Sequence, residues 1–298
     1  MKNFELTNET IANDCGVTLH RIKAVKDIIT PRFTVKAGEL GGFVEKVDNL
    51  ADDAWVSDNA CVYGNALVSD NALVSDNACV YDDAEVSGNA WVCGNARVYD
   101  NACAYGNARV YDNTRVYDNA RVYGNACVYD DVEVSGNAWV CGNARVYDNA
   151  CVYGNACVYG NACVYGNARI YDDAEVYGNT DVSDNAWVCG NARVCGNTRI
   201  YDDVRVYGDA RVYGNACVYD DAEVFRTNHY LVVGPIGSRN GYTTFFRSKE
   251  GAIKVKCGCF GGTTDEFLDK VEKTHGDSKY AKVYRIATEM ALAQIDMN

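Results

Sequence analysis

The segments Asn95-Ala-Arg-Val-Tyr-Asp100 and Asn119-Ala-Arg-Val-Tyr-Gly124 are two copies of a six-residue unit that decides the fold. In this unit Asn or Asp is followed by a small residue, a variable residue x, Val or Ile, a residue that is mostly Tyr, Ser or Cys, and Gly or Asp. The unit repeats from Asp53 to Arg226 in 29 consecutive copies, with mild departures such as Ala104 at the valine position. Such a repeat predicts a solenoid, in which each coil packs on its neighbours.

The segment x-Val-Tyr predicts a short strand in every unit. Side chains alternate across a strand, so the valine is expected to face the interior while x and Tyr face outward. Gly or Asp followed by Asn or Asp is expected to form the corner, because these residues tolerate left-handed backbone angles. The small residue after the corner also points inward, where a large side chain would not fit. The interior is therefore predicted to consist of valine and alanine.

Three six-residue sides close most simply as a triangle, with 18 residues per coil. Each strand is then expected to pair with the copies 18 residues away, so that Val74 lies between Val56 and Val92. Val44 and Leu50 continue the valine phase upstream of the repeat. The solenoid is therefore expected to begin near Gly41.

The order Val-Tyr-Gly-Asn-Ala-x resembles the pattern aliphatic–x–x–x–small–x of the left-handed parallel β-helix superfamily. Only the resemblance implies the left-handed sense, since parallel crossover connections are usually right-handed. The predicted fold is an all-β solenoid, a left-handed parallel β-helix of triangular section, over residues 41–226. Members of this superfamily are often trimers, so the resemblance implies a homo-oligomer and favours a trimer.

The residues outside the repeat are expected to cover its ends, where unpaired strands would otherwise be exposed. Residues 1–40 are predicted to form a β-rich N-terminal cap, and residues 227–298 a small α+β domain with three strands and then helices. The expected strands of that domain are Tyr230–Val233, Tyr242–Arg247 and Ile253–Phe260. Thr263-Thr-Asp-Glu266 is a capping box that predicts a helix start, and Gly276 is expected to separate two helices.

The charge and the cysteines indicate a cytosolic protein. The net charge is −13, of which −14 lies in residues 53–226, −1 in residues 1–52 and +2 in residues 227–298. An acidic repeat predicts no affinity for membranes or for nucleic acid. The start of the chain lacks an apolar secretory segment, and no 18-residue apolar run is present. The chain has 15 cysteines, and many of them occupy the x position, where they exchange freely with other residues; this favours reduced thiols over disulfides.

The outer surface of the repeat admits two interpretations. The segment Asp82–Trp91 recurs 48 residues later as Asp130–Trp139, and Trp187 follows after another 48 residues. This pattern is explained by duplication of a 48-residue block or by a spiral binding stripe. The repeat also holds 18 of the 22 tyrosines, and all its basic residues are arginines. These residues form either a self-supporting Tyr/Arg lattice or an aromatic surface that stacks on bases or partner side chains.

Catalysis is not expected. The superfamily includes acyltransferases and metal-dependent carbonic anhydrases, which implies a histidine on a loop or three histidines on a metal. The three histidines here, His20, His229 and His275, all lie outside the 29 units. Cys257 and Cys259 form a single C-x-C pair without a second pair of metal ligands. We therefore predict no catalytic residue, no metal site and no cofactor.

A candidate anion site lies in the C-terminal domain, which is slightly basic. Ser238 and Arg239 end the segment Gly234-Pro-Ile-Gly-Ser-Arg239, and Arg247, Lys254 and Lys256 follow in the expected strands. These five residues are the predicted ligand-binding residues. The alternative interpretation is a solubilising cap with ordinary surface charges.

Three segments together resemble hexapeptide-repeat proteins of phages and prophages. They are Val35-Lys-Ala-Gly-Glu-Leu-Gly-Gly-Phe-Val44, the Asn-Ala-x-Val-Tyr-Gly units, and the tail with Cys257-Gly-Cys-Phe, Glu-Phe267 and Thr-His-Gly276. The resemblance implies a non-catalytic binding or scaffold protein in the bacterial cytosol that engages a host protein or sequesters a small nucleotide signal. One alternative hypothesis is an acidic mimic of DNA, although the charge density of the repeat is only about half that of duplex DNA. Another is an acyltransferase-like enzyme.

Overall fold

The repeat forms short, evenly spaced strands in the computed structural model, which describes residues 2–297. The chain divides into two units, Met1–Gly160 and Asn161–Asn298. The strands of the repeat in the first unit are β6 (Trp55–Val56), β7 (Cys61–Val62), β8 (Leu67–Val68), β9 (Leu73–Val74), β10 (Cys79–Val80), β11 (Glu85–Val86), β12 (Trp91–Val92), β13 (Arg97–Val98), β14 (Cys103–Ala104), β15 (Arg109–Val110), β16 (Arg115–Val116), β17 (Arg121–Val122), β18 (Cys127–Val128), β19 (Glu133–Val134), β20 (Trp139–Val140), β21 (Arg145–Val146), β22 (Cys151–Val152) and β23 (Cys157–Val158). Those in the second are β24 (Cys163–Val164), β25 (Arg169–Ile170), β26 (Glu175–Val176), β27 (Asp181–Val182), β28 (Trp187–Val188), β29 (Arg193–Val194), β30 (Arg199–Ile200), β31 (Arg205–Val206), β32 (Arg211–Val212), β33 (Cys217–Val218) and β34 (Glu223–Val224).

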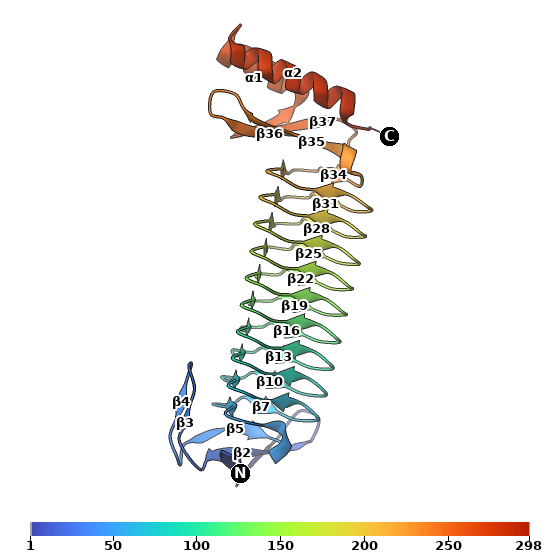
Figure 1. Cartoon of the computed structure of the whole chain (residues 1–298). Coiled ribbons are helices and arrows are strands. Elements are labelled where there is room, and N and C mark those ends of the chain that lie inside the picture. Colours follow the sequence, from blue (N-terminus) through green and yellow to red (C-terminus); the bar gives the residue numbers. More distant parts are fainter. Residues whose placement is uncertain (1, 298) are drawn as a thin grey trace. The chain divides into compact units, whose positions relative to one another are not determined.

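Every third strand pairs in parallel, which gives three sheets and confirms the 18-residue register. In the first unit the orders are β7-β10-β13-β16-β19-β22, β8-β11-β14-β17-β20-β23 and β6-β9-β12-β15-β18-β21. In the second they are β25-β28-β31-β34, β26-β29-β32 and β24-β27-β30-β33. Val74 pairs with Val56 and with Val92, as predicted. The repeat thus supplies about ten coils of a parallel β-solenoid, whose stacking Figure 1 shows within each unit.

The interior of the coils consists of the valine and the small residue of each unit. Val122 and Ala120, for example, are fully buried. Thr114 occupies the small position and is also fully buried, because its Oγ1 donates a hydrogen bond of 2.9 Å to the carbonyl of Tyr111. The inward assignment of both positions is therefore confirmed, and a hydroxyl is tolerated only where a carbonyl accepts it.

The corners have the predicted left-handed backbone, with φ of 59° at Asp70 and 69° at Gly88. Asp adds a contact that Gly cannot make, because its carboxylate accepts a backbone N–H one coil further on. Gly88 N donates to Asp70 Oδ2 at 2.9 Å in this way. The next corner residue forms amide ladders, such as Asn107 Nδ2 donating to Asn125 Oδ1 at 3.0 Å. The polar corner residues are therefore structural, and they link successive coils.

The N-terminal residues form a cap that merges with the first coil. Its strands are β1 (Phe4–Ala12), β2 (Thr18–Ala24), β3 (Ile28–Ile29), β4 (Thr34–Val35) and β5 (Leu40–Val44). β1 pairs with β2 and β2 with β5, both antiparallel, and β5 continues in parallel with β7. The parallel pairing of Phe43 with Cys61 and of Val44 with Val62 therefore extends the 18-residue register into β5. Trp55, at the x position of the first unit, is an exception to the exposure expected of x residues: it is only 2% exposed, and an added Cβ on Gly41 would lie 2.7 Å from its ring.

The C-terminal domain contains an antiparallel sheet and two helices. The sheet has the order β35 (Tyr230–Ile236), β36 (Gly241–Arg247), β37 (Ile253–Cys257) and β38 (Phe260–Thr263). The expected single strand Ile253–Phe260 is wrong, because Gly258 adopts a φ of 59° and turns the chain so that Cys257 pairs with Phe260. The helices are α1 (Thr264–His275) and α2 (Lys279–Gln294), with the predicted capping box at Thr263 and the predicted break at Gly276.

Candidate functional site

The two faces of the C-terminal sheet separate the predicted ligand-binding residues. Ile253 and Val255 of β37 are buried in the cluster that includes residues of both helices. Lys254 and Lys256 alternate with them and contact residues of the last coil instead. The five predicted residues therefore do not form a single site.

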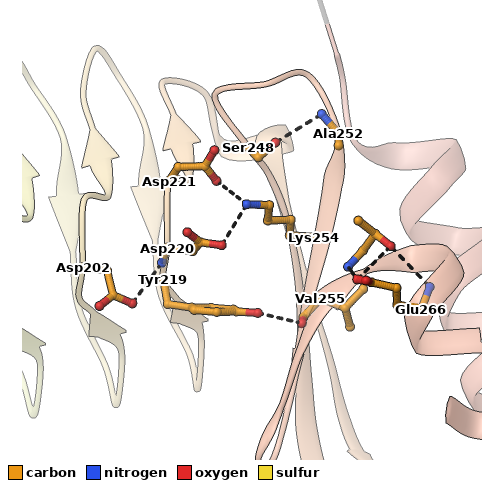
Figure 2. Close-up of polar contacts among 10 residues, drawn as sticks. Asp202, Tyr219, Asp220, Asp221, Ser248, Ala252, Lys254, Val255 and Glu266 are labelled. Atoms are coloured by element: carbon orange, nitrogen blue, oxygen red, sulfur yellow. Dashed lines mark hydrogen bonds and ion pairs between the residues drawn. The ribbon is translucent and has the colours of Figure 1, made fainter.

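Lys254 ends a column of aspartates in the last coils. Asp202 N donates to Asp184 Oδ2 at 3.5 Å, and Asp220 N donates to Asp202 Oδ2 at 3.2 Å. At the next position Lys254 Nζ donates to Asp220 Oδ2 at 2.8 Å and to Asp221 Oδ1 at 2.7 Å, as Figure 2 shows. The ammonium thus takes the place of the backbone N–H that a further coil would provide.

The charge of Lys254 is consequently balanced within the chain. Burial alone would lower the pKa of its ammonium, but the hydrogen bonds that it donates to the two aspartates outweigh burial and raise the pKa above its usual value. The side chain is 16% exposed. An external anion would have to displace two carboxylates to reach it, which makes Lys254 part of the attachment of the sheet to the coil.

Lys256 and Arg247 lie over aromatic rings of the last coil. Lys256 Nζ is 4.6 Å from the ring centre of Tyr219, and the Arg247 guanidinium is 4.8 Å from that of Phe225. Tyr219 Oη also donates to the carbonyl of Val255 at 3.3 Å. These cation–π contacts hold the sheet on the coil.

Ser238 and Arg239 line a different feature, a hollow of about 400 Å³ on the helix side of the domain. They lie between β35 and β36, opposite the turn between β37 and β38 and beside both helices. The hollow is lined by Ser238, Arg239, Gly241, Tyr242, Cys257, Gly258, Cys259, Phe260, Phe267, Lys270, Val271, Thr274, His275 and Tyr284. It therefore combines aromatic rings with the cationic side chains of Arg239 and Lys270.

Tyr284 forms a fixed part of this hollow. It is 8% exposed, and its ring contacts that of Phe267 edge to face at 5.5 Å. Burial, together with the neighbouring Cys257 thiol, raises the pKa of Tyr284 to about 12, so its hydroxyl stays protonated at neutral pH. Gly237, with a φ of 75°, packs directly on that hydroxyl, and an added Cβ would overlap it. The loop that carries Ser238 and Arg239 is thereby placed against the ring.

The hollow has the size and composition of a small-ligand site. Such sites measure roughly 300–1,000 Å³ and combine apolar walls with a few polar groups. The planar guanidinium of an arginine binds a carboxylate or phosphate through two parallel hydrogen bonds. Exposed ring edges and faces beside it suit an aromatic ring of the same ligand. Among residues 2–297, no group of three or more His, Cys, Asp and Glu side chains could hold a metal ion.

Lys270 was missed from the sequence, although a signal for it exists. The capping box at Thr263 sets the helical phase of α1, and Phe267 and Val271 mark its buried face. Lys270 and Thr274 lie three positions beyond these residues and therefore on the same side of the helix. What the sequence could not show is that the loop with Arg239 lies opposite this side.

The outer tyrosines of the first unit stack on each other. Tyr63, Tyr81, Tyr99 and Tyr117 form one column with ring-centre distances of 5.0, 4.9 and 5.1 Å and interplanar angles of 6° or less. In the second unit Trp187 lies between the guanidinium groups of Arg169 and Arg205, at 5.5 and 5.0 Å. Because neighbours already cover these ring faces, the contacts favour the Tyr/Arg lattice over a surface that stacks on bases.

The stacked coils and the terminal hollow define a β-solenoid repeat protein with a candidate binding site outside the repeat. A family model, the YdcK beta solenoid repeat, matches residues 115–130, 138–154, 144–160 and 198–213. All the matched residues lie in the coils. The match therefore supports the class of repeat and does not include the C-terminal domain. A comparison with curated proteins gives no match. Between residues 2 and 297, no helix has the length and apolar character needed to cross a membrane.

Proposed function

We propose that this chain is a non-catalytic binding protein whose C-terminal hollow takes a small anionic ligand with an aromatic ring, such as a nucleotide. The observation that carries the proposal is that Arg239 and Lys270 line the same hollow as Tyr242, Phe260 and Tyr284. The cations suit a phosphate, and the rings suit a base. The five residues come from four different segments of the domain, so the combination arises only in the folded state.

The charge distribution supports an anionic ligand at this end of the chain. Residues 227–298 carry a net charge of +2, whereas the repeat carries −14. Lys254 is neutralised by Asp220 and Asp221, but neither Arg239 nor Lys270 has an ion pair among residues 2–297. Their positive charge is therefore available to a ligand.

Sequestration rather than turnover is proposed because of the arrangement of the histidines. His275 lines the hollow, and its ring lies 6.0 Å from that of Tyr280 and 5.8 Å from that of Tyr284. His229 is fully buried beneath the ring of Phe225, at a ring-centre distance of 4.0 Å. Burial, and then the nearby Arg247, lower the pKa of His229, so it is neutral at pH 7 and away from the hollow. These surroundings are typical of packed rather than catalytic histidines.

The setting of the protein is proposed from the resemblance described above. It implies a phage- or prophage-encoded chain in the bacterial cytosol that withholds a nucleotide signal or binds a host protein. The same resemblance implies a homo-oligomer and favours a trimer. Native mass spectrometry of the chain purified from phage-infected cells distinguishes these partners by the mass of whatever copurifies.

Titration calorimetry with adenosine monophosphate, and with inorganic phosphate as a second probe, tests the hollow. Replacing Arg239 or Lys270 with Ala is expected to weaken binding of adenosine monophosphate about tenfold or more, since a charged hydrogen bond contributes roughly 1.5–3 kcal/mol. The matched control is Lys273→Ala, which removes an equal charge from an exposed position of α1 outside the hollow. Equal affinity of Arg239→Ala and the unmodified chain, or no binding of either probe, would contradict the proposal.

A further inference from the structure

Cysteine interrupts the outer tyrosine columns in four units of the repeat. These cysteines, each at the position that tyrosine occupies in most units, are Cys93, Cys141, Cys189 and Cys195. In an uninterrupted column the rings of successive coils stack, as Tyr105 and Tyr123 do at a ring-centre distance of 4.9 Å. A cysteine in the column therefore leaves the space of one ring between the coil before it and the coil after it.

A tryptophan lies beside three of the four cysteines. The residue two positions before the cysteine is Trp91, Trp139 or Trp187 in these units. Each indole contacts the outer residue of the preceding coil: Trp139 and Trp187 meet tyrosine rings edge to face at 6.2 and 6.3 Å, and Trp91 Nε1 donates to a serine hydroxyl at 3.0 Å. The chain thus places an aromatic ring of its own where the tyrosine is missing.

Cys195 lacks such a tryptophan. Its unit carries Arg193 at that position, and Arg193 Nη2 forms an ion pair with Glu175 Oε1 at 3.2 Å. A hollow of about 430 Å³ lies here, which we call the ring gap; it is lined by Tyr177, Arg193, Cys195, Arg211, Tyr213 and Thr227. Its volume falls within the range of roughly 300–1,000 Å³ that is typical of small-ligand sites.

Serine also interrupts the columns, but neighbouring side chains cover it. Ser135 and Ser183 stand between tyrosines of the adjacent coils and are only 9% and 4% exposed. At the ring gap, in contrast, Cys195 is only half-buried and Tyr213 is 54% exposed. The space beside Cys195 is therefore open to a ligand from solution.

The tyrosines on the two sides of the ring gap are held by contacts within the chain. A hydrogen bond with the Cys195 thiol, and then burial, raise the pKa of Tyr177, so its hydroxyl stays protonated at neutral pH. The backbone N–H of Tyr213 donates to Tyr230 Oη at 3.1 Å, and these two rings meet edge to face at 6.3 Å. Tyr177 and Tyr213 belong to coils two apart, so one flat ring system between them can contact both.

Arg211 gives the ring gap an unbalanced positive charge. It pairs in register with Arg193 on the adjacent strand, and Glu175 balances the charge of Arg193. Within residues 2–297, Arg211 itself forms no ion pair. A guanidinium of this kind binds a carboxylate through two parallel hydrogen bonds.

We propose that the ring gap binds a small molecule that carries a flat aromatic ring and a carboxylate. The aromatic ring packs between Tyr177 and Tyr213, where the chain elsewhere places a tyrosine or an indole, and the carboxylate pairs with Arg211. The ring gap shares no residue with the hollow of the C-terminal domain, so binding here does not require Arg239 or Lys270.

Titration calorimetry with indoleacetate tests the ring gap. The unmodified chain is expected to bind this probe, and Cys195→Tyr is expected to bind one molecule fewer per chain, because the new ring completes the column without changing the charge. Arg211→Ala is expected to weaken the binding about tenfold or more, since it removes the partner of the carboxylate. Cyclohexaneacetate, which has the carboxylate without an aromatic ring, is expected to bind more weakly than indoleacetate.

Two variants outside the ring gap serve as matched controls. Ser87→Tyr adds a ring at the same position of another unit, and Arg145→Ala removes an equal charge from an exposed x position; both should bind as the unmodified chain does. Tyrosine is the commonest residue at the position of Cys195, so Cys195→Tyr is expected to keep the fold, which circular dichroism verifies. The proposal would be overturned by an unmodified chain that does not bind indoleacetate, by an unchanged number of bound molecules in Cys195→Tyr, or by equal affinity for cyclohexaneacetate.

Discussion

Replacing Val122 with Asp is expected to unfold the coils around it. Val122 is fully buried and pairs with Ala104 on one side and Val140 on the other. A carboxylate there would lack both water and a hydrogen-bond donor, because the interior side chains are apolar apart from a few threonines whose hydroxyls already donate to backbone carbonyls. The expected cost is roughly 4 kcal/mol or more, which is among the largest for single substitutions.

Denaturant unfolding followed by circular dichroism measures this loss. The matched control is Arg121→Asp, which introduces the same side chain one residue earlier on the exposed face of the same strand. We expect the control to change the free energy of unfolding by less than about 1 kcal/mol. Comparable stability of the Val122 variant and the control would contradict the inward placement of the valine column.

Replacing Lys254 with Met is expected to loosen the C-terminal sheet from the last coil. Methionine keeps the apolar stem but leaves Asp220 and Asp221 without their shared cation, close to Asp202. Charged hydrogen bonds contribute roughly 1.5–3 kcal/mol, and exposure of Asp220 (52%) reduces this, so we expect a loss of about 2 kcal/mol. Hydrogen exchange should rise in β37 and in residues 217–226.

The pH dependence of this effect has a definite sign. The raised pKa of Lys254 means that the folded state holds its proton more tightly than the unfolded state. The stabilisation is therefore complete below the ordinary lysine pKa, about 10.4, and is lost only as the pH rises through the higher folded value. The difference between the unmodified chain and the variant should be constant from pH 7 to about 10. Lys249→Met, an exposed lysine of the same domain, should show no difference at all.

The coils could be predicted from the sequence because 29 consecutive units share the same pattern of apolar, small and turn-forming residues. The valine position is apolar in every unit, the following unit begins with a small residue after the corner, and the corner itself consists of Gly, Asp and Asn. Together these features are compatible with one arrangement of the chain, in which the apolar and small residues face the interior. The burial of Trp55 was not predicted, since it depends on the cap that covers the side chain rather than on the pattern of its own unit. The turn at Gly258 was not predicted for another reason: a single glycine within a strand pattern does not indicate which backbone angle it adopts.

The candidate site was only partly predictable. Ser238 and Arg239 stood out as polar residues in a glycine-rich loop, and the structure places both at the hollow. Lys254 and Lys256 have the same charge but lie on the other face of the sheet. There Lys254 forms ion pairs with aspartates of the last coil, and Lys256 lies over the ring of a tyrosine of that coil. Composition cannot distinguish a cation that a ligand neutralises from one that the chain neutralises, because the difference arises only when distant segments meet.

The in-register stacking of identical units has a consequence for how the gene can change. Unequal recombination between tandem copies adds or removes whole blocks, and the 48-residue block that recurs at Asp82 and Asp130 contains eight units. Because the block is a whole number of units, the valines of neighbouring coils still stack on valines and the corners on corners after such an event. The altered chain therefore has a fully packed interior without compensating mutations. Natural variants of different length are therefore expected to remain folded, and length itself becomes a trait that selection can adjust.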